Sequence, residues 1–275
     1  MEKLKGKVAL VTGSGRGIGR SVALKLASEG ARIVANDLDA GPANEVVAEI
    51  KALGSDAIAV IGSVTDPEFA DRFIKAAIEG FGSLDIIVNN AGYTMDAMIH
   101  KMSDDAFDSL YAVHLKAPFQ ILRAASQFII GAAKLETEEG REVFRKVVNI
   151  SSVAGIGGNV GQANYSSMKA GVLGLTKTLA KEWGRYKVNV NCVGFGFIET
   201  RLTQASEEKM TVKVDGGKEA AIGMPAKVID SFKKMIPLGR PGTPEEAADA
   251  VYLLCSPESN YISGQTLICG GGFTL

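Results

Sequence analysis

The sequence is poor in the residues that build metal sites and disulfides, and it has no long apolar run. Only three cysteines occur among 275 residues, Cys192, Cys255 and Cys269, and they lack metal-ligand spacing. Their odd number favours reduced, buried thiols, and we predict no metal site. No apolar run reaches the roughly 18 residues of a membrane-spanning helix, and the first apolar segment begins too early for a signal peptide. We therefore expect a soluble, cytoplasmic protein with no membrane partner.

An excess of charge of one sign is also missing. The 30 Lys and Arg residues and 31 Asp and Glu residues give a formal net charge of −1, spread along the chain. A surface that binds a phosphate backbone needs clustered basic residues, so we expect no nucleic-acid partner. What the sequence does contain is 46% hydrophobic residues and 32 glycines. These suffice for a large core connected by many tight turns.

Short apolar runs alternate with amphipathic segments along the whole chain. The expected strands are residues 8–11, 32–36, 57–61, 84–89, 146–151, 188–193 and 265–269. The expected helices are residues 18–28, 45–53, 67–81, 104–135, 165–185 and 244–254. Apolar strands separated by helices are typical of a parallel sheet covered on both faces. We predict an α/β fold: a single doubly wound (Rossmann-type) domain, residues 1–275, with a seven-stranded parallel sheet and ligands at the carboxyl ends of the strands.

Two segments depart from this alternation. Residues 136–145, "ETEEGREVFR", form a charged insertion that we interpret as a solvated helix end or loop. Residues 203–234 show no strong periodicity, and so long a segment inside a compact domain is usually a lid or mobile. We therefore treat residues 203–234 as a candidate substrate lid.

A glycine-rich turn, residues 12–19, follows the first expected strand in "VALVTGSGRGIG". Glycine lets a backbone approach a pyrophosphate closely, and the N-terminus of the next helix offers N–H groups to phosphates. The spacing differs from the G-x-G-x-x-G fingerprint, and any tight strand–helix turn can use glycines. Asp37, 18 residues after Gly19, can accept hydrogen bonds from ribose hydroxyls and would repel a 2′-phosphate. We favour NAD(H), while Arg16 could hold a 2′-phosphate and keeps NADP(H) open.

A tyrosine and a lysine stand one helical turn apart in "NYSSMKAG", residues 164–171. Alone, Tyr165 and Lys169 would be an ordinary surface pair. However, Ser152 lies thirteen residues before Tyr165, and "TGSGRGIG" and "NNAG" precede them. In this order the motifs resemble the short-chain dehydrogenase/reductase family over essentially the whole chain, including the tail "SGQTLICGGG". The segment "GNVGQANY" is similar to the 3-oxoacyl-acyl-carrier-protein reductase branch.

The resemblance implies a catalytic role for each of these three residues. Tyr165 is expected to be the general acid or base, and Ser152 to hydrogen-bond the substrate oxygen. Lys169 is expected to hold the nicotinamide ribose and to lower the pKa of Tyr165. An ammonium about 4 Å away contributes roughly 4 kcal/mol at an effective dielectric of about 20, which corresponds to about three pKa units.

The resemblance also implies which residues contact the cofactor. They are Gly13, Ser14, Arg16, Gly17, Ile18, Gly19, Asp37, Ser63, Val64, Asn90, Ala91, Gly92, Tyr165, Lys169, Ile198 and Thr200. Within this set, Val64 corresponds to an adenine contact, and Ile198 and Thr200 to contacts with the nicotinamide carboxamide.

Four positions depart from the family pattern. Where members commonly carry an asparagine that holds a relay water, this chain has His114, which we interpret either as the relay group or as a substituted core histidine. The usual proline–glycine after the sixth strand is Phe195–Gly196. An aspartate usual beside Val64 is Ser63, which puts one adenine hydrogen bond in doubt, and Gly270 replaces a common aspartate in the tail.

The resemblance implies an NAD(P)-dependent oxidoreductase that interconverts a secondary alcohol and a ketone. The substrate is expected to be a small molecule or an acyl thioester, with a 3-oxoacyl/3-hydroxyacyl thioester favoured. Two alternatives stay open: the same chemistry on a sugar, steroid or small cyclic alcohol, and a nucleotide-binding sensor with weak or no catalysis. The resemblance further implies a homotetramer.

Overall fold

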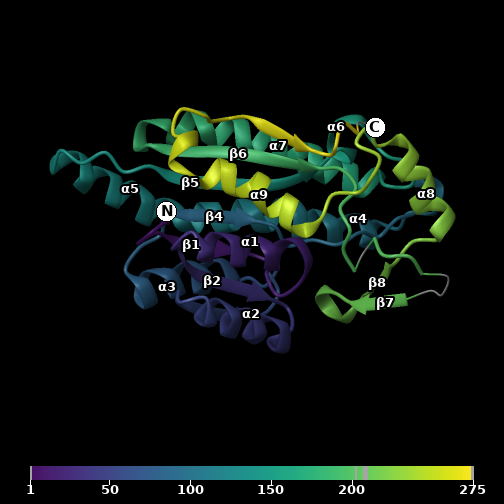
Figure 1. Cartoon of the computed structure of the whole chain (residues 1–275), viewed down its shortest axis with the longest axis horizontal. Coiled ribbons are helices and arrows are strands. Elements are labelled where there is room, and N and C mark those ends of the chain that lie inside the picture. Colours follow the sequence, from purple (N-terminus) through teal and green to yellow (C-terminus); the bar gives the residue numbers. More distant parts are fainter. Residues whose placement is uncertain (1, 202, 207–209, 274–275) are drawn as a thin grey trace.

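A parallel sheet of seven strands forms the centre of the computed structural model, which describes residues 2–201, 203–206 and 210–273. The strand order is β3-β2-β1-β4-β5-β6-β9, and every neighbouring pair is parallel. The strands are β1 (Val8–Val11), β2 (Arg32–Asp37), β3 (Ala57–Ile61), β4 (Ile86–Asn89), β5 (Arg145–Ser152), β6 (Val188–Phe195) and β9 (Thr266–Cys269). This order, together with helices on both faces (Figure 1), confirms the predicted doubly wound fold.

Two apolar clusters join the helices to opposite faces of the sheet. Along β1, Ala9 and Val11 belong to one cluster, while Val8 and Leu10 belong to the other, as the two-residue period of a strand requires. The first cluster is shared with α1 (Gly17–Ser28), α2 (Ala40–Ala52) and α9 (Pro244–Cys255). The second is shared with α3 (Phe69–Phe81), α4 (Asp104–Tyr111), α5 (Ala117–Glu138) and α7 (Ala163–Trp183). Because both faces of the sheet are covered, strands β1 and β3 are apolar at every position.

Prolines account for two differences between the predicted and the observed helices. Helix α2 begins at Ala40, five residues before the predicted start, and includes Pro42 in its first turn, where a backbone N–H has no helical partner anyway. The predicted helix over 104–135 is interrupted by a π-helical turn, Ala112–Lys116. Pro118 follows that turn and has no N–H to donate to the carbonyl of His114, four residues earlier. The helix therefore changes its winding at His114.

The charged insertion 136–145 is not solvated at its ends. Arg145 begins β5 with a side chain only 4% exposed, and it forms an ion pair with Glu136, which is 12% exposed. Both terminal nitrogens of Arg145 donate to the two Glu136 oxygens, at 2.8 and 2.7 Å, and Nε donates to the Leu84 carbonyl at 3.2 Å. The prediction of a solvated helix end or loop holds for residues 137–142, which are exposed and include the end of α5 at Glu138. It fails for Glu136 and Arg145, because a sequence pattern does not show that two distant charges of opposite sign pair in the interior.

Replacing Glu136 with glutamine should lower the free energy of unfolding by about 3–5 kcal/mol, since the variant leaves the buried Arg145 charge without a counter-ion. Urea unfolding followed by circular dichroism measures this change. The matched control is Glu139→Gln, which breaks an exposed pair with Arg141 and should cost less than about 1 kcal/mol. Equal stability of the two variants would contradict the buried-pair assignment.

Residues 203–234 contain regular structure that the sequence pattern did not reveal. Strands β7 (Met210–Lys213) and β8 (Glu219–Ile222) pair antiparallel as a hairpin, and helix α8 (Ala226–Met235) follows. Four-residue strands are too short to show a clear period. Figure 1 shows the hairpin beyond the carboxyl ends of the main strands. Residues 207–209 of the candidate lid lie outside the described residues.

No helix within the described ranges has both the length and the apolar character needed to span a membrane.

Candidate active site

A cavity of about 1060 Å³ opens at the carboxyl ends of the central strands. With one exception, the residues predicted for the site all line it: Gly13, Arg16, Gly17, Ile18, Gly19, Asp37, Ser63, Val64, Asn90, Ala91, Gly92, His114, Ser152, Tyr165, Lys169, Ile198 and Thr200. The exception is Ser14, which is fully buried and hydrogen-bonds the backbone N–H and carbonyl of Asn36. Ser14 therefore fixes the turn against β2 and does not face the cavity.

The glycine turn packs so tightly against its neighbours that side chains at Gly15 and Gly19 would clash with them. A Cβ on Gly19 would lie 2.1 Å from the Gly13 carbonyl oxygen, and one on Gly15 would lie 2.6 Å from Asp37 Oδ2. Gly13 and Gly17 have positive φ, 61° and 52°. The turn thus exposes bare backbone and the N-terminus of α1 to the cavity, an arrangement that suits a pyrophosphate.

Asn36 is a structural residue of the turn that the sequence analysis missed. Its Oδ1 accepts from the N–H of Gly13 at 3.2 Å, and its Nδ2 donates to the carbonyls of Val60 and Gly62, both at 3.0 Å. Asn36 thereby ties the turn to the end of β3. The signal was a polar residue inside the apolar strand "RIVAND", where a side chain must satisfy its own hydrogen bonds.

Acidic side chains surround the single basic residue of the turn. Asp37 Oδ2 accepts from the N–H of Gly15 at 3.0 Å, and Asp37 Oδ1 accepts from that of Asp39 at 3.1 Å. Arg16 pairs with Asp39 at 2.8 Å and lies 3.8 Å from Asp37. The Arg16 charge is therefore already balanced by two carboxylates, and the wall of the cavity is net acidic beside the turn.

Amide side chains hold the next two strand ends in place. Asn90 Nδ2 donates to the carbonyls of Thr12 and Gly13, at 2.9 and 3.1 Å. Asn89 donates to Asn149 at 2.8 Å, and Asn149 donates to Thr176 at 2.9 Å. This chain of hydrogen bonds connects β4, β5 and α7, so the strand carrying Ser152 and the helix carrying Tyr165 are held in register.

Ser152, Tyr165 and Lys169 meet at the same end of the cavity. Lys169 Nζ donates to the Ile150 carbonyl at 2.7 Å and lies 5.6 Å from the centre of the Tyr165 ring. Burial lowers the pKa of Lys169 to about 8. Burial also raises the pKa of Tyr165 to about 12, an effect that a hydrogen bond with Ser152 opposes. Desolvation of the phenol is the largest effect on the pKa of Tyr165 in this structure, so that pKa is raised, whereas a lowering by Lys169 was expected.

His114 is buried and neutral, and it lies against Tyr165. Its Nε2 is 2.7 Å from the Tyr93 carbonyl, which can only accept, so Nε2 carries the proton. Burial, with a contribution from the charge of Lys169, holds the pKa of His114 well below its usual value. The remaining nitrogen, Nδ1, is buried and has no hydrogen-bond partner among the described residues. The ring stands edge-on to Tyr165, with centroids 5.2 Å apart.

Gly92 makes room for this histidine. A Cβ on Gly92 would lie 2.2 Å from His114 Cε1. The imidazole therefore needs a glycine at the end of "NNAG", which is a steric role in addition to lining the cavity.

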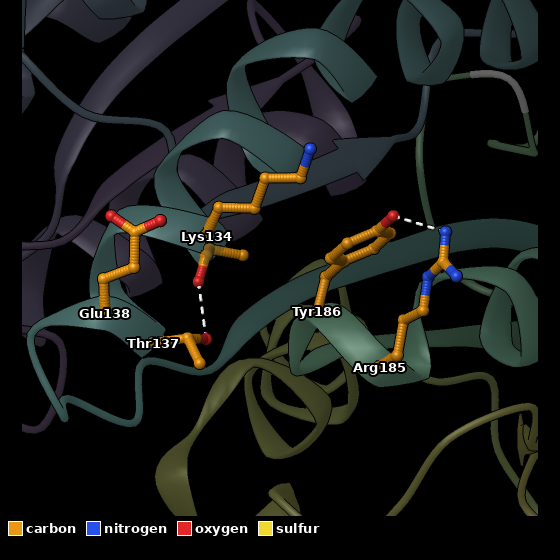
Figure 2. A pocket seen from close by; sticks show the side chains of 6 residues that line it. Lys134, Thr137, Glu138, Arg185 and Tyr186 are labelled. Carbon is orange, nitrogen blue, oxygen red and sulfur yellow. Dashed lines mark hydrogen bonds between the residues drawn. The ribbon is translucent and has the colours of Figure 1, made fainter.

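A second hollow of about 520 Å³ lies at the far end of α5. Figure 2 shows Lys134, Thr137 and Glu138 from α5 around it, together with Arg185 and Tyr186 from the turn Gly184–Tyr186. None of the residues predicted for the site lines this hollow. In the part of the chain that the structure describes, no group of three or more His, Cys, Asp and Glu side chains is placed to hold a metal ion.

Comparisons with known proteins show the family of the chain. The 3-oxoacyl-acyl-carrier-protein reductase FabG of Thermotoga maritima is 35% identical, with 99% of this chain and 100% of that protein covered. The 3-oxoacyl-acyl-carrier-protein reductase of a Synechocystis species is 39% identical, with 100% of both chains covered. A (3R)-3-hydroxyacyl-CoA dehydrogenase of Canis lupus familiaris is 37% identical, with 99% and 98% covered. Residues 7–211 match the family model of the short chain dehydrogenases. The chain belongs to the short-chain dehydrogenase family of NAD(P)-dependent oxidoreductases.

Proposed function

We propose that the protein reduces the ketone of a 3-oxoacyl thioester to a secondary alcohol, using NADH and a Ser152–Tyr165–Lys169 site. The observation that carries the proposal is that these three side chains line the same cavity as the glycine turn and Asp37. The full-length similarity to reductases and dehydrogenases of 3-oxoacyl and 3-hydroxyacyl compounds supports the choice of substrate.

The residues around the turn favour NADH over NADPH. Asp37 lies at the end of β2 and lines the cavity, so its carboxylate can accept from the ribose hydroxyls. A 2′-phosphate would approach both Asp37 and Asp39, and Arg16 is already paired with those carboxylates. Repulsion between anions disfavours the phosphorylated cofactor.

Tyr165 is the proton donor in this proposal. The chemistry that a nicotinamide held at this end of the cavity would supply is hydride transfer to the carbonyl carbon. As charge develops on the substrate oxygen, the Tyr165 hydroxyl donates its proton there and the Ser152 hydroxyl donates a hydrogen bond. The pKa of about 12 keeps Tyr165 protonated at neutral pH, which suits an acid in the reductive direction.

Lys169 and His114 support this proton transfer. The positive charge of Lys169 stabilises the phenolate that Tyr165 becomes after donating its proton. The His114 ring lies edge-on to Tyr165, and its buried Nδ1 has no hydrogen-bond partner among the described residues, so this nitrogen could accept a hydrogen bond in a relay between Tyr165 and Lys169. The Nε2 hydrogen bond to Tyr93 keeps the ring in the tautomer that leaves Nδ1 free to accept.

The hairpin β7–β8 and helix α8 are proposed to cover the substrate as a lid. Val212, Glu219 and Met224 line the cavity from this segment. Lids of this kind exclude water during proton transfer.

A homotetramer is proposed from the apolar surfaces that remain exposed. Phe107, Tyr111, Phe119 and Leu135 are exposed on α4 and α5, and Leu267 and Ile268 are exposed on the edge strand β9. An apolar edge strand and apolar helix faces are typical of association surfaces.

A substrate panel tests the proposed function. Purified protein is assayed for oxidation of NADH and NADPH with 3-oxoacyl thioesters, keto sugars, ketosteroids and small cyclic ketones. We expect turnover with the 3-oxoacyl thioesters and a preference for NADH. Turnover restricted to another class would contradict the substrate assignment, and cofactor binding without turnover on any ketone would favour a sensor.

Ketone reduction should decline as the pH rises above about 8. Lys169, with a pKa of about 8, loses its charge long before Tyr165, with a pKa of about 12, loses its proton. The active form is the protonated lysine, so activity is complete below that pKa and is lost above it. The measurement is kcat/KM for ketone reduction from about pH 6 to pH 11. A flat profile up to about pH 10 would contradict this assignment, provided that circular dichroism shows a folded protein throughout.

A further inference from the structure

The sheet topology places one end of a bound dinucleotide at Ser63 and Val64. The glycine turn before α1 suits the pyrophosphate, and Asp37 at the end of β2 suits the adjoining ribose. Strand β3 is the neighbour of β2 on the side away from the Tyr165 end of the cavity. The base attached to that ribose therefore reaches the residues that follow β3. Ser63 and Val64 follow β3 and line the cavity there.

A carboxylate from a distant part of the chain reaches the same place. Asp215 lies in the short turn Asp215–Gly217 between β7 and β8, and it lines the cavity. The Ser63 hydroxyl donates a hydrogen bond to Asp215 Oδ1, and Ser63 Oγ also lies 2.7 Å from the Thr65 hydroxyl oxygen. The hairpin thus adds an acidic group to a subsite whose own residues, Ser63 and Val64, carry none.

The position of Asp215 is fixed from both sides of the hairpin. Val214 and Ala220 are buried in the apolar cluster that also contains Val64 and Tyr93. Lys218 bonds Asp105 and Ser109 on α4, the latter at 2.7 Å. The hairpin is therefore docked against the core beside the subsite, and its carboxylate is held in place.

The Asp215 carboxylate has more acceptor capacity than its protein partners use. A carboxylate offers about four lone-pair sites, whereas Ser63 supplies one donor, and within the described ranges Asp215 has no ion pair. Burial raises its pKa, which the hydrogen bond from Ser63 opposes and the charge of Asp66 reinforces. A partly buried acceptor of this kind is stabilised by further N–H donors.

We propose that Asp215 recognises the adenine base of the cofactor by accepting a hydrogen bond from its exocyclic amine. This assignment rests on the proposed NAD-dependent function. It makes the hairpin part of the cofactor site as well as a cover for the substrate. A base with a carbonyl oxygen in place of the amine would place an acceptor opposite the carboxylate. Repulsion between the two acceptors would weaken binding of that dinucleotide.

The test compares NADH with its hypoxanthine analogue, deamino-NADH, in which a carbonyl oxygen replaces the adenine amine. Dissociation constants are measured by calorimetry without substrate, so the readout does not depend on turnover. A hydrogen bond to a charged group predicts that the wild-type protein binds NADH at least about tenfold more tightly than deamino-NADH. In Asp215→Asn the amide can donate to the carbonyl, and the ratio should fall to about one or invert.

The control variant is Lys218→Ala, which loosens the hairpin without changing the groups that face the base. It should weaken both dinucleotides equally and leave their ratio unchanged. If Asp215→Asn shows the same ratio of NADH to deamino-NADH affinity as the wild type, the assignment is overturned. The contact between Asp215 and Ser63 would then only hold the hairpin in place. If the wild-type protein binds neither dinucleotide, the proposed cofactor fails together with this assignment. If it binds both equally well, only the assignment fails.

Discussion

Replacing Tyr165 with phenylalanine should reduce kcat for ketone reduction by about 10²–10⁴-fold, the usual contribution of a positioned general acid. The variant removes one oxygen atom and keeps the ring that packs edge-on against His114. Cofactor binding should change little, because the substitution leaves the glycine turn and Asp37 unchanged. Steady-state kinetics with NADH and a 3-oxoacyl thioester, together with calorimetric NADH binding, measure both quantities.

Tyr111→Phe is the matched control for this experiment. Tyr111 ends helix α4, is exposed and does not line the cavity. The control should keep wild-type kcat. Turnover by Tyr165→Phe within a few-fold of the control would show that another group supplies the proton.

Replacing Asp37 with asparagine should weaken NADH binding by about 10–100-fold, the loss expected when a ribose hydroxyl no longer donates to a charged acceptor. The asparagine Oδ1 can still accept one of the two backbone hydrogen bonds that Asp37 holds in the turn, so the fold of the turn should persist. NADPH binding should weaken far less or improve, because the substitution removes one of the two carboxylates beside Arg16. Calorimetric dissociation constants for both cofactors give the comparison.

The control for this prediction is Asp56→Asn, a substitution of the same chemistry at an exposed residue before β3 that does not line the cavity. It should leave both dissociation constants unchanged. An Asp37→Asn variant that keeps wild-type preference for NADH would contradict the role given to Asp37 and would shift the origin of any preference to Asp39.

The central sheet could be predicted because the burial of its strands is visible in their apolar sequences. The runs over residues 8–11 and 57–61 were placed with the observed bounds, since a strand covered on both faces is apolar at every position. The break at His114 was missed because the amphipathic period continues through it while Pro118 withdraws a backbone donor. The amphipathic pattern of a helix and its backbone hydrogen bonds are separate constraints on its geometry. Only the amphipathic pattern can be read from the spacing of apolar residues.

The site was predictable where its residues lie in short motifs and was missed where it depends on distant contacts. Ser152, Tyr165 and Lys169 are close in sequence, and the structure places all three on one cavity. Asp215 lies 152 residues from its partner Ser63, in a segment without period. The raised pKa of Tyr165 could not be predicted from the sequence, because desolvation depends on everything that packs around the phenol.

The most direct test of the central claim follows the hydrogen that is transferred. A 3-oxoacyl thioester is incubated with the protein and NADH that carries deuterium at the transferring C4 position, and the product is analysed by mass spectrometry. We expect a 3-hydroxyacyl thioester with one deuterium on the carbon that bears the new hydroxyl, while the hydroxyl proton comes from solvent through Tyr165. Tight binding of NADH without a deuterated product would contradict this expectation.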